Sequence, residues 1–185
     1  VLSTTSKEGR ATSILLSCMA KVQEIAAAQL KTMGIKAGKR TKVDCFTEVV
    51  FNNSSQANKR PDGLIVINTG AQTKYFLIEA KIGSAALDAN QIESYMRICK
   101  EHKLDGVVTI SNQYSSSPDI HPIEEVRKIK LKVPVLHWSW MSILTTIDLL
   151  LSNEEIVDHD QMLITNELRR FLSHESTGVK GFDRM

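Results

Sequence analysis

The sequence predicts an α/β protein in which a mixed central sheet of about five strands is flanked by helices. Short apolar runs rich in β-branched and aromatic residues occur at 64–67, 75–78 and 106–110, and each is typical of a buried strand. The segment 68–74 between the first two runs has hairpin-loop composition, which predicts antiparallel pairing. A helical pattern separates the second run from the third, which predicts a crossover and parallel pairing.

The other elements follow from periodicity. Apolar residues at three- and four-residue spacing predict a first helix over 5–33, where Thr5 and Glu8 are typical of a capping box. Alternation predicts a strand over 43–51, and helical spacing returns over 88–103. The rest of the chain is expected to form a short helix, a strand and two helices, over 123–130, 133–138, 139–151 and 153–173. The predicted order is α-β-β-β-α-β, followed by a fifth strand and C-terminal helices.

Charged residues stand at the ends of the two hairpin strands. Pro61-Asp62 enters the first, and Glu79-Ala80-Lys81 closes the second. Strand alternation puts Glu79 and Lys81 on one face with Ala80 turned away, and antiparallel pairing brings Asp62 opposite them. Two carboxylates and an ammonium at one sheet edge suit a divalent metal and a phosphodiester. The alternative is an exposed hairpin end with an ordinary surface ion pair. The metal site is favoured because charges rarely end a buried strand without a partner or ligand.

Pro61-Asp62 … Glu79-Ala80-Lys81 resembles the signature of the PD-(D/E)XK nuclease superfamily, which includes restriction endonucleases, Holliday-junction resolvases and RecB-type exonucleases. The segment from Gln91 to Tyr95 matches the QxxxY element of the RecB-type branch. The resemblance covers roughly the middle third of the chain, and the predicted element order fits a restriction-endonuclease-like fold. The RecB-type branch usually has a histidine before its first strand, whereas the first histidine here is His102.

The resemblance implies a metal-dependent nuclease that hydrolyses phosphodiester bonds in DNA, in a restriction, defence or repair setting. The implied catalytic residues are Asp62, Glu79, Lys81 and Gln91. The implied ligands of Mg²⁺ or Mn²⁺ are Asp62, Glu79 and the Ala80 backbone carbonyl. A third carboxylate is common in these enzymes. Glu48 is the first candidate because it is predicted mid-strand beside Asp62, and Glu24 on the first helix is the second. Lys81 would orient the attacking water and stabilise the transition state.

Several of these residues also have simpler interpretations. With Asp88 as N-cap, Gln91 would complete a capping box, and this role is as well supported as one at the site. Tyr95 is equally well explained as a core residue. The Ser/Asn-rich loop 111–117 follows a strand at the expected active edge, but its composition is also that of a solvated loop.

Bulk properties fit a globular protein rather than a disordered chain. The 185 residues suit a single domain over 1–185, with 42% hydrophobic and 24% charged residues and a net charge of +2. Val1 in place of an initiator Met also fits a piece of a larger protein. On charge alone, the basic clusters are best interpreted as solvated loops, and only their position near the proposed site supports a functional role. They are Lys36, Lys39, Arg40 and Lys42; Lys59 and Arg60; Arg127, Lys128, Lys130 and Lys132.

Three scattered cysteines, Cys18, Cys45 and Cys99, are expected to be buried free thiols in a reducing compartment, which favours the cytoplasm. No apolar stretch reaches the ~20 residues of a membrane helix, so no membrane partner is expected. Trp138 and Trp140 are interpreted as core anchors. The histidines show no zinc-site spacing, and no Gly-rich phosphate loop follows a strand.

Two other functional classes stay open. The first is a catalytically silent nuclease-like module that binds nucleic acid or a partner protein. The second is an interaction or assembly domain without a nucleic-acid role. A homodimer, or additional domains of a longer protein, is compatible with either class and with the nuclease.

Overall fold

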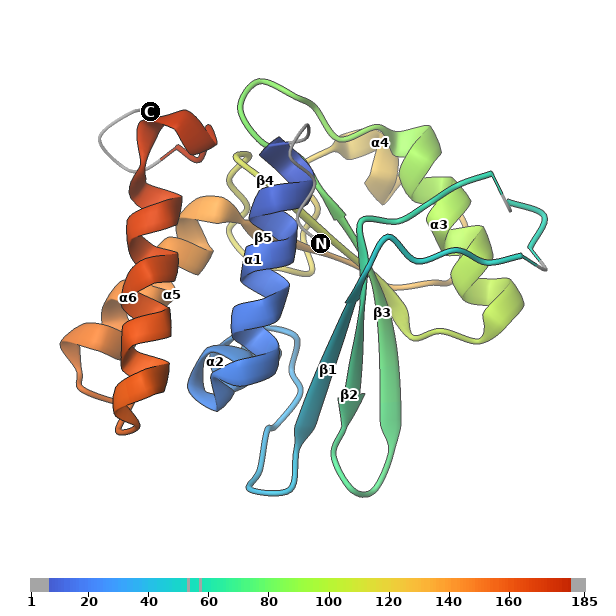
Figure 1. The fold of residues 1–185 in the computed structure, drawn as a ribbon. Helices are drawn as coiled ribbons and strands as arrows, with labels where there is room; N and C mark the ends of the chain where they lie inside the picture. The colour runs from blue at the N-terminus through green and yellow to red at the C-terminus, as the bar shows by residue number, and fades with distance from the viewer. Residues whose placement is uncertain (1–6, 53, 57, 181–185) are drawn as a thin grey trace.

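The computed structural model describes residues 7–52, 54–56 and 58–180, and its centre is a five-stranded mixed sheet (Figure 1). The strands lie in chain order: β1 (Lys42–Thr47), β2 (Gly63–Asn68), β3 (Thr73–Ala80), β4 (Gly106–Ser111) and β5 (Val135–Ser139). The pairs β1–β2 and β2–β3 are antiparallel, whereas β3–β4 and β4–β5 are parallel. The predicted α/β class with a mixed five-stranded sheet is confirmed.

Helices cover both faces of the sheet. They are α1 (Lys7–Lys21), α2 (Gln23–Thr32), α3 (Ala89–His102), α4 (Glu124–Arg127), α5 (Trp140–Ser152) and α6 (His159–Ser173), followed by the 3₁₀ turn η1 (Glu175–Thr177). In Figure 1, α2, α5 and α6 lie to the left of β1, β2 and β3, α1 crosses in front of β4 and β5, α3 lies to the right, and α4 lies near the top beside α3. The helices on each face enclose their own apolar core against the sheet. Trp138 and Trp140 are 1% and 0% exposed in the larger core, as expected.

The expected first helix is two helices. Val22 has φ −108° and ψ 104°, an extended conformation that interrupts the helical backbone between α1 and α2. The Val22 side chain is fully buried, so this turn packs into the larger core. The bend lets α1 pack along β1 while α2 contacts α5. Periodicity missed it because the apolar spacing continues across Val22. Thr5, the proposed cap, lies outside the described residues.

Two further boundaries differ from the prediction. The first strand ends at Thr47, because Glu48 adopts a left-handed φ of 54° that a strand cannot continue through. The last helix begins at His159, where the Asp158 carboxylate accepts from the Gln161 N–H at 2.9 Å. Asn153, predicted to cap that helix, instead follows the end of α5.

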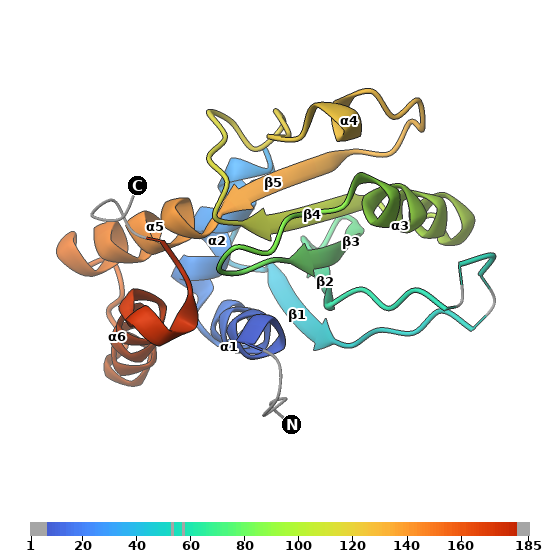
Figure 2. The same ribbon diagram turned by 90° about the horizontal axis from the view of Figure 1, so that it is seen from above.

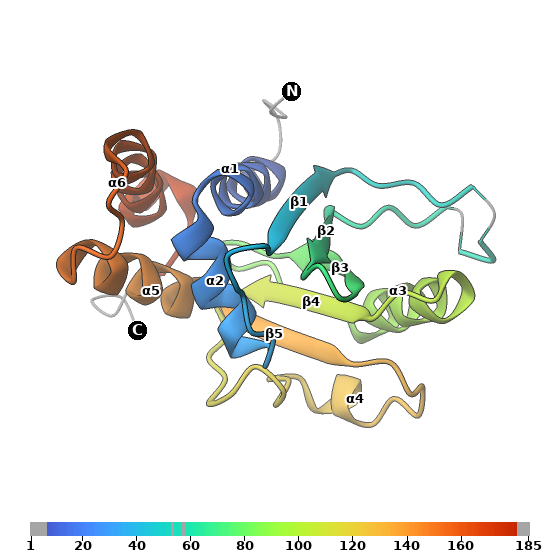
Figure 3. The ribbon, with the colours of Figure 1, turned by 90° about the horizontal axis from the view of Figure 1, so that it is seen from below.

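The connection from β1 to β2 reaches away from the sheet on the side where α3 lies (Figures 2 and 3). Glu101 on α3 anchors it, accepting hydrogen bonds from the hydroxyls of Ser54 and Ser55 and from the Ser55 N–H. Phe51 packs on the ring of His102, with centroids 4.9 Å apart. The connection is thereby fixed to α3 before it returns to the strand that follows Asp62.

The loop after β4 runs beside β5, the last strand of the sheet. The His137 N–H on β5 donates to the Pro118 carbonyl at 2.7 Å, and a ring nitrogen of the same histidine lies 3.0 Å from the Gln113 carbonyl. This loop therefore occupies hydrogen-bonding groups that a neighbouring strand would otherwise use.

Cys18 and Cys99 are buried free thiols, as predicted, whereas Cys45 on β1 is partly exposed. Burial raises the pKa of the Cys18 thiol to about 11. Among the described residues, no helix is long and apolar enough to cross a membrane.

Candidate active site

The hairpin of β2 and β3 brings Asp62 against the end of β3. The register pairs Gly63 with Ile78, so Asp62 falls beside the segment that contains Glu79 and Ala80. The Ala80 N–H donates to Asp62 Oδ2 at 2.8 Å. This bond fixes the carboxylate at the strand end and leaves its second oxygen turned away from that donor. The predicted juxtaposition of Asp62 with the end of the second strand is confirmed.

Glu79 and Lys81 meet on one face, as strand alternation predicts. Lys81 Nζ lies 2.6 Å from Glu79 Oε1. The Glu79 side chain is almost fully buried, and its second oxygen, Oε2, is buried with no donor in hydrogen-bond geometry among the described residues, although the Tyr95 hydroxyl lies nearby. Lys81 Nζ also lies 3.6 Å from Glu8 Oε2. Glu8 stands in the first turn of α1, so a third carboxylate reaches the site from a helix.

Gly63 explains how α1 comes so close. A β-carbon at this position would lie 2.6 Å from Leu16 Cδ1 on α1 and 2.9 Å from the Phe46 carbonyl oxygen. Glycine avoids the clash with the Phe46 backbone and gives the Leu16 side chain of α1 room over the start of β2. The N-terminal turn of the helix, with Glu8, therefore lies next to Lys81.

Burial shapes the titration of the three charged residues. Burial, with the neighbouring charge of Asp62, raises the pKa of Glu79 to about 7, although Lys81 and the nearby Tyr95 hydroxyl act in the opposite direction. Burial also raises the pKa of Asp62 above its ordinary value. Burial alone would lower the pKa of Lys81, but Glu79, Glu8 and Asp62 together raise it. Lys81 is therefore an ammonium ion at neutral pH.

Gln91 and Tyr95 form a small polar cluster at the start of α3. The Gln91 side-chain amide donates to the Tyr95 hydroxyl at 2.8 Å, and that hydroxyl lies 3.3 Å from the Arg60 carbonyl. Asp88 does cap α3, but it accepts from the Asn90 N–H, so the capping-box interpretation of Gln91 is wrong. Tyr95 is fully buried and also faces Glu79, so it is both a core residue and a neighbour of the site.

The two predicted third carboxylates lie elsewhere. Glu48 is not mid-strand; its side chain is 65% exposed and its Oε1 lies 3.9 Å from Arg60 Nη2. Glu24 is on α2, where it lines a groove shared with α5. Glu8 was overlooked because its spacing from Thr5 suggested a cap. Its spacing from the buried residues Ala11 and Leu15 was the available signal, since it places Glu8 on the buried stripe.

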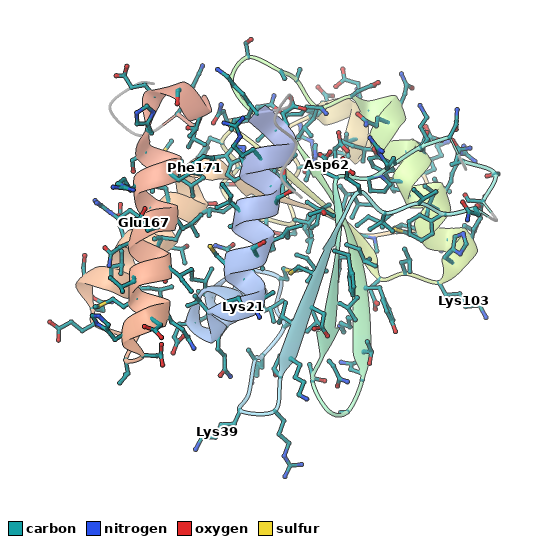
Figure 4. All side chains as sticks on the ribbon, in the orientation of Figure 1. Lys21, Lys39, Asp62, Lys103, Glu167 and Phe171 are labelled. Atoms are coloured by element: carbon teal, nitrogen blue, oxygen red, sulfur yellow. The ribbon has the colours of Figure 1, made fainter. Side chains whose placement is uncertain are left out.

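The basic clusters divide between the two ends of the sheet. Lys39, with its neighbours Lys36 to Lys42, lies exposed at the end opposite Asp62 (Figure 4), which agrees with the favoured interpretation of a solvated loop. The reason is that the cluster precedes β1, whose start pairs with the end of β2. Arg60 adjoins Asp62, and its charge lowers the pKa of that carboxyl. The third cluster is in and after α4.

Two histidines far apart in sequence meet beside β4. Thr109 Oγ1 lies 3.0 Å from His121 Nε2 and 2.9 Å from His137 Nδ1, and all three residues are buried. The remaining ring nitrogens lie near the Ile123 N–H and the Gln113 carbonyl. Burial lowers the pKa of His121 to about 4 and lowers that of His137. These histidines are neutral structural groups that hold the loop after β4.

The donor set at the strand ends fits a hard cation. A buried carboxylate oxygen without a hydrogen bond is costly, and Glu79 Oε2 is such an atom. Two carboxylates with water and substrate oxygens suffice for Mg²⁺. Among the described residues, no group of three or more Asp, Glu, His or Cys side chains is already arranged to hold a metal.

No protein-family model matches this chain, and no curated protein matches it in sequence.

Proposed function

We propose that this chain is a metal-dependent nuclease of the PD-(D/E)XK type that hydrolyses phosphodiester bonds in DNA. The observation that carries the proposal is the convergence at one sheet edge of Asp62, Glu79 and Lys81, with one Glu79 oxygen buried and lacking a hydrogen bond within the part of the chain that the structure describes. The mixed sheet, in which an antiparallel hairpin is followed by parallel strands, is compatible with a restriction-endonuclease-like fold.

In this proposal, Asp62 and Glu79 hold Mg²⁺ or Mn²⁺, and the Ala80 carbonyl is a further candidate ligand. When bound, the ion lowers the pKa of a coordinated water and screens charge on the scissile phosphate. Lys81 acts as an ammonium ion, because its pKa is raised: it orients the attacking water and stabilises negative charge in the transition state.

Gln91 and Tyr95 support this arrangement from α3. The Gln91 amide holds the Tyr95 hydroxyl, and that hydroxyl faces Glu79. Gln91 is thus proposed to assist the site through Tyr95 as a positioning residue. Arg60, which follows the connection anchored on α3, offers a cation for a substrate phosphate.

The direct experiment is incubation of the purified chain with duplex, single-stranded and plasmid DNA, in Mg²⁺, in Mn²⁺ and in EDTA. Cleavage is expected with either metal and not with EDTA. Binding to DNA without cleavage under every condition would contradict the nuclease proposal in favour of a silent binding module. The absence of both DNA binding and DNA cleavage would contradict any nucleic-acid role.

A second prediction concerns the third carboxylate. Glu8→Gln should lower the rate of metal-dependent cleavage about ten- to a hundredfold, because Glu8 contacts Lys81 at the site. Glu48→Gln is the matched control and should retain the wild-type rate, since that side chain is exposed. Single-turnover rates at saturating Mg²⁺ measure both. A larger loss in the Glu48 variant would assign the role to Glu48 instead.

A further inference from the structure

We propose that Asn112 is a positioning residue for Lys81, acting through the turn that follows Lys81 in the chain. The inference rests on the proposed nuclease function, which gives Lys81 its catalytic role. Asn112 comes directly after β4, and β4 pairs in parallel with β3. The two strands therefore end at the same edge, which brings Asn112 close to the segment that leaves Lys81.

The Asn112 carboxamide joins three separate backbone groups. Its Nδ2 donates to the carbonyls of Gly83 at 3.1 Å and Gly178 at 2.9 Å, and its Oδ1 accepts from the Lys180 N–H at 3.0 Å. Two donors and one acceptor are needed at these positions, so a carboxamide fits and a carboxylate does not. Asn112 thus ties the turn at 82–83 to the segment 178–180.

The same turn is held on its other sides. The Lys81 N–H donates to the Ile110 carbonyl at 2.8 Å, and the Lys81 carbonyl accepts from the indole Nε1–H of Trp140 at 2.8 Å. The Gly83 N–H donates to the Gly178 carbonyl at 3.0 Å. Lys81 therefore stands in a short segment whose position depends on both the fully buried Trp140 and the bonds of Asn112.

The 178–180 segment packs closely against the turn that follows Lys81. A β-carbon at Gly178, where φ is +82°, would lie 3.2 Å from both Cα and N of Gly83. The next residue, Val179, is 5% exposed. Because the two backbones are in contact, we expect loss of the Asn112 bonds to loosen both of them, and with them the position of the Lys81 ammonium relative to Glu79.

Asn112→Asp tests the inference, because it keeps the side-chain shape but directs a carboxylate at two carbonyl oxygens. We expect the single-turnover rate of Mg²⁺-dependent cleavage to fall about ten- to a hundredfold while the dissociation constant for DNA is unchanged. The second readout is NMR hydrogen exchange of the two indole N–H groups. Exchange at Trp140 should accelerate, whereas Trp138, which donates to Thr32 Oγ1, should not change.

Asn166→Asp is the matched control, because Asn166 is exposed on α6 and its side chain bonds only a carbonyl of its own helix in the described structure. It should leave both readouts at wild-type values. An unchanged Trp140 signal in the Asn112 variant would overturn the inference, as would equal acceleration at both tryptophans. If Asn112→Asp does not fold, Asn112→Ser, which loses bonds without adding charge, is subject to the same two criteria. If the wild type never cleaves DNA, the nuclease proposal is contradicted. Hydrogen exchange at the Trp140 indole N–H would still show whether Asn112 fixes the backbone at Lys81.

Discussion

Asp62→Asn should abolish Mg²⁺-dependent DNA cleavage, lowering the single-turnover rate by about a thousandfold or more. The physical reason is specific to the charge. An asparagine oxygen can still accept the Ala80 N–H, so the strand end keeps its geometry. What is lost is one of two negative charges that would hold the cation. Because Asp62 is partly desolvated, removing its charge is not expected to destabilise the fold.

Asp44→Asn supplies the control for this substitution. Asp44 is an exposed residue of β1, on the strand that pairs with β2, and its replacement should leave cleavage at the wild-type rate. Melting temperatures and metal-free DNA binding should be similar for both variants and the wild type. Cleavage by Asp62→Asn at a rate close to that of the wild type would remove this residue from the mechanism.

Glu79→Gln should make the metal-free protein more stable at pH 8 than the wild type, by roughly 2–3 kcal/mol, and equally stable below about pH 4. In the folded state the pKa of Glu79 is raised from 4.5 to about 7, so the folded protein holds this proton to higher pH than the unfolded chain. The contribution of protonated Glu79 to the free energy of unfolding is therefore fully present below the unfolded-state pKa of about 4.5, and it is lost as the pH rises through the folded-state pKa of about 7. Glutamine mimics the protonated form at every pH.

The measured quantity is the difference in unfolding free energy between variant and wild type, from urea titrations in EDTA at several pH values. Comparing the variant with the wild type cancels the effect of His121 and His137. Their pKa values are lowered, so their contribution to the stability of both proteins is lost as the pH falls. Glu167→Gln, on the exposed face of α6, is the control: its unfolding free energy should change with pH in the same way as that of the wild type. Parallel curves for Glu79→Gln would refute the raised pKa. Saturating Mg²⁺ should stabilise the wild type at pH 8 more than the variant.

Local patterns were sufficient for the centre of the site. Asp62, Glu79 and Lys81 belong to one hairpin, where strand alternation and antiparallel pairing determine which side chains meet. The same reasoning predicted the strands of the mixed sheet, because each is a short apolar run bounded by polar loops. Failures occurred where a single backbone conformation decides a boundary, as with extended Val22 and left-handed Glu48.

Contacts between distant segments could not be read from the sequence. Glu8 lies near Lys81 because α1 packs on β1, β2 and β3, and Asn112 bonds the 178–180 segment, which is far from it in the chain. The pairing of His121 with His137 through Thr109 has the same origin. None of these pairs has a short spacing, so tertiary packing alone creates them.

The strand order also determines which backbone groups border the sheet. With β1 and β5 as the two borders, each presents backbone groups to which a second molecule could add a strand. On β5 the Pro118 carbonyl already takes the His137 N–H. The β1 border is only six residues long and carries the charged side chains of Lys42 and Asp44. One border is thus partly covered by the loop after β4, and the other carries two exposed charges of opposite sign.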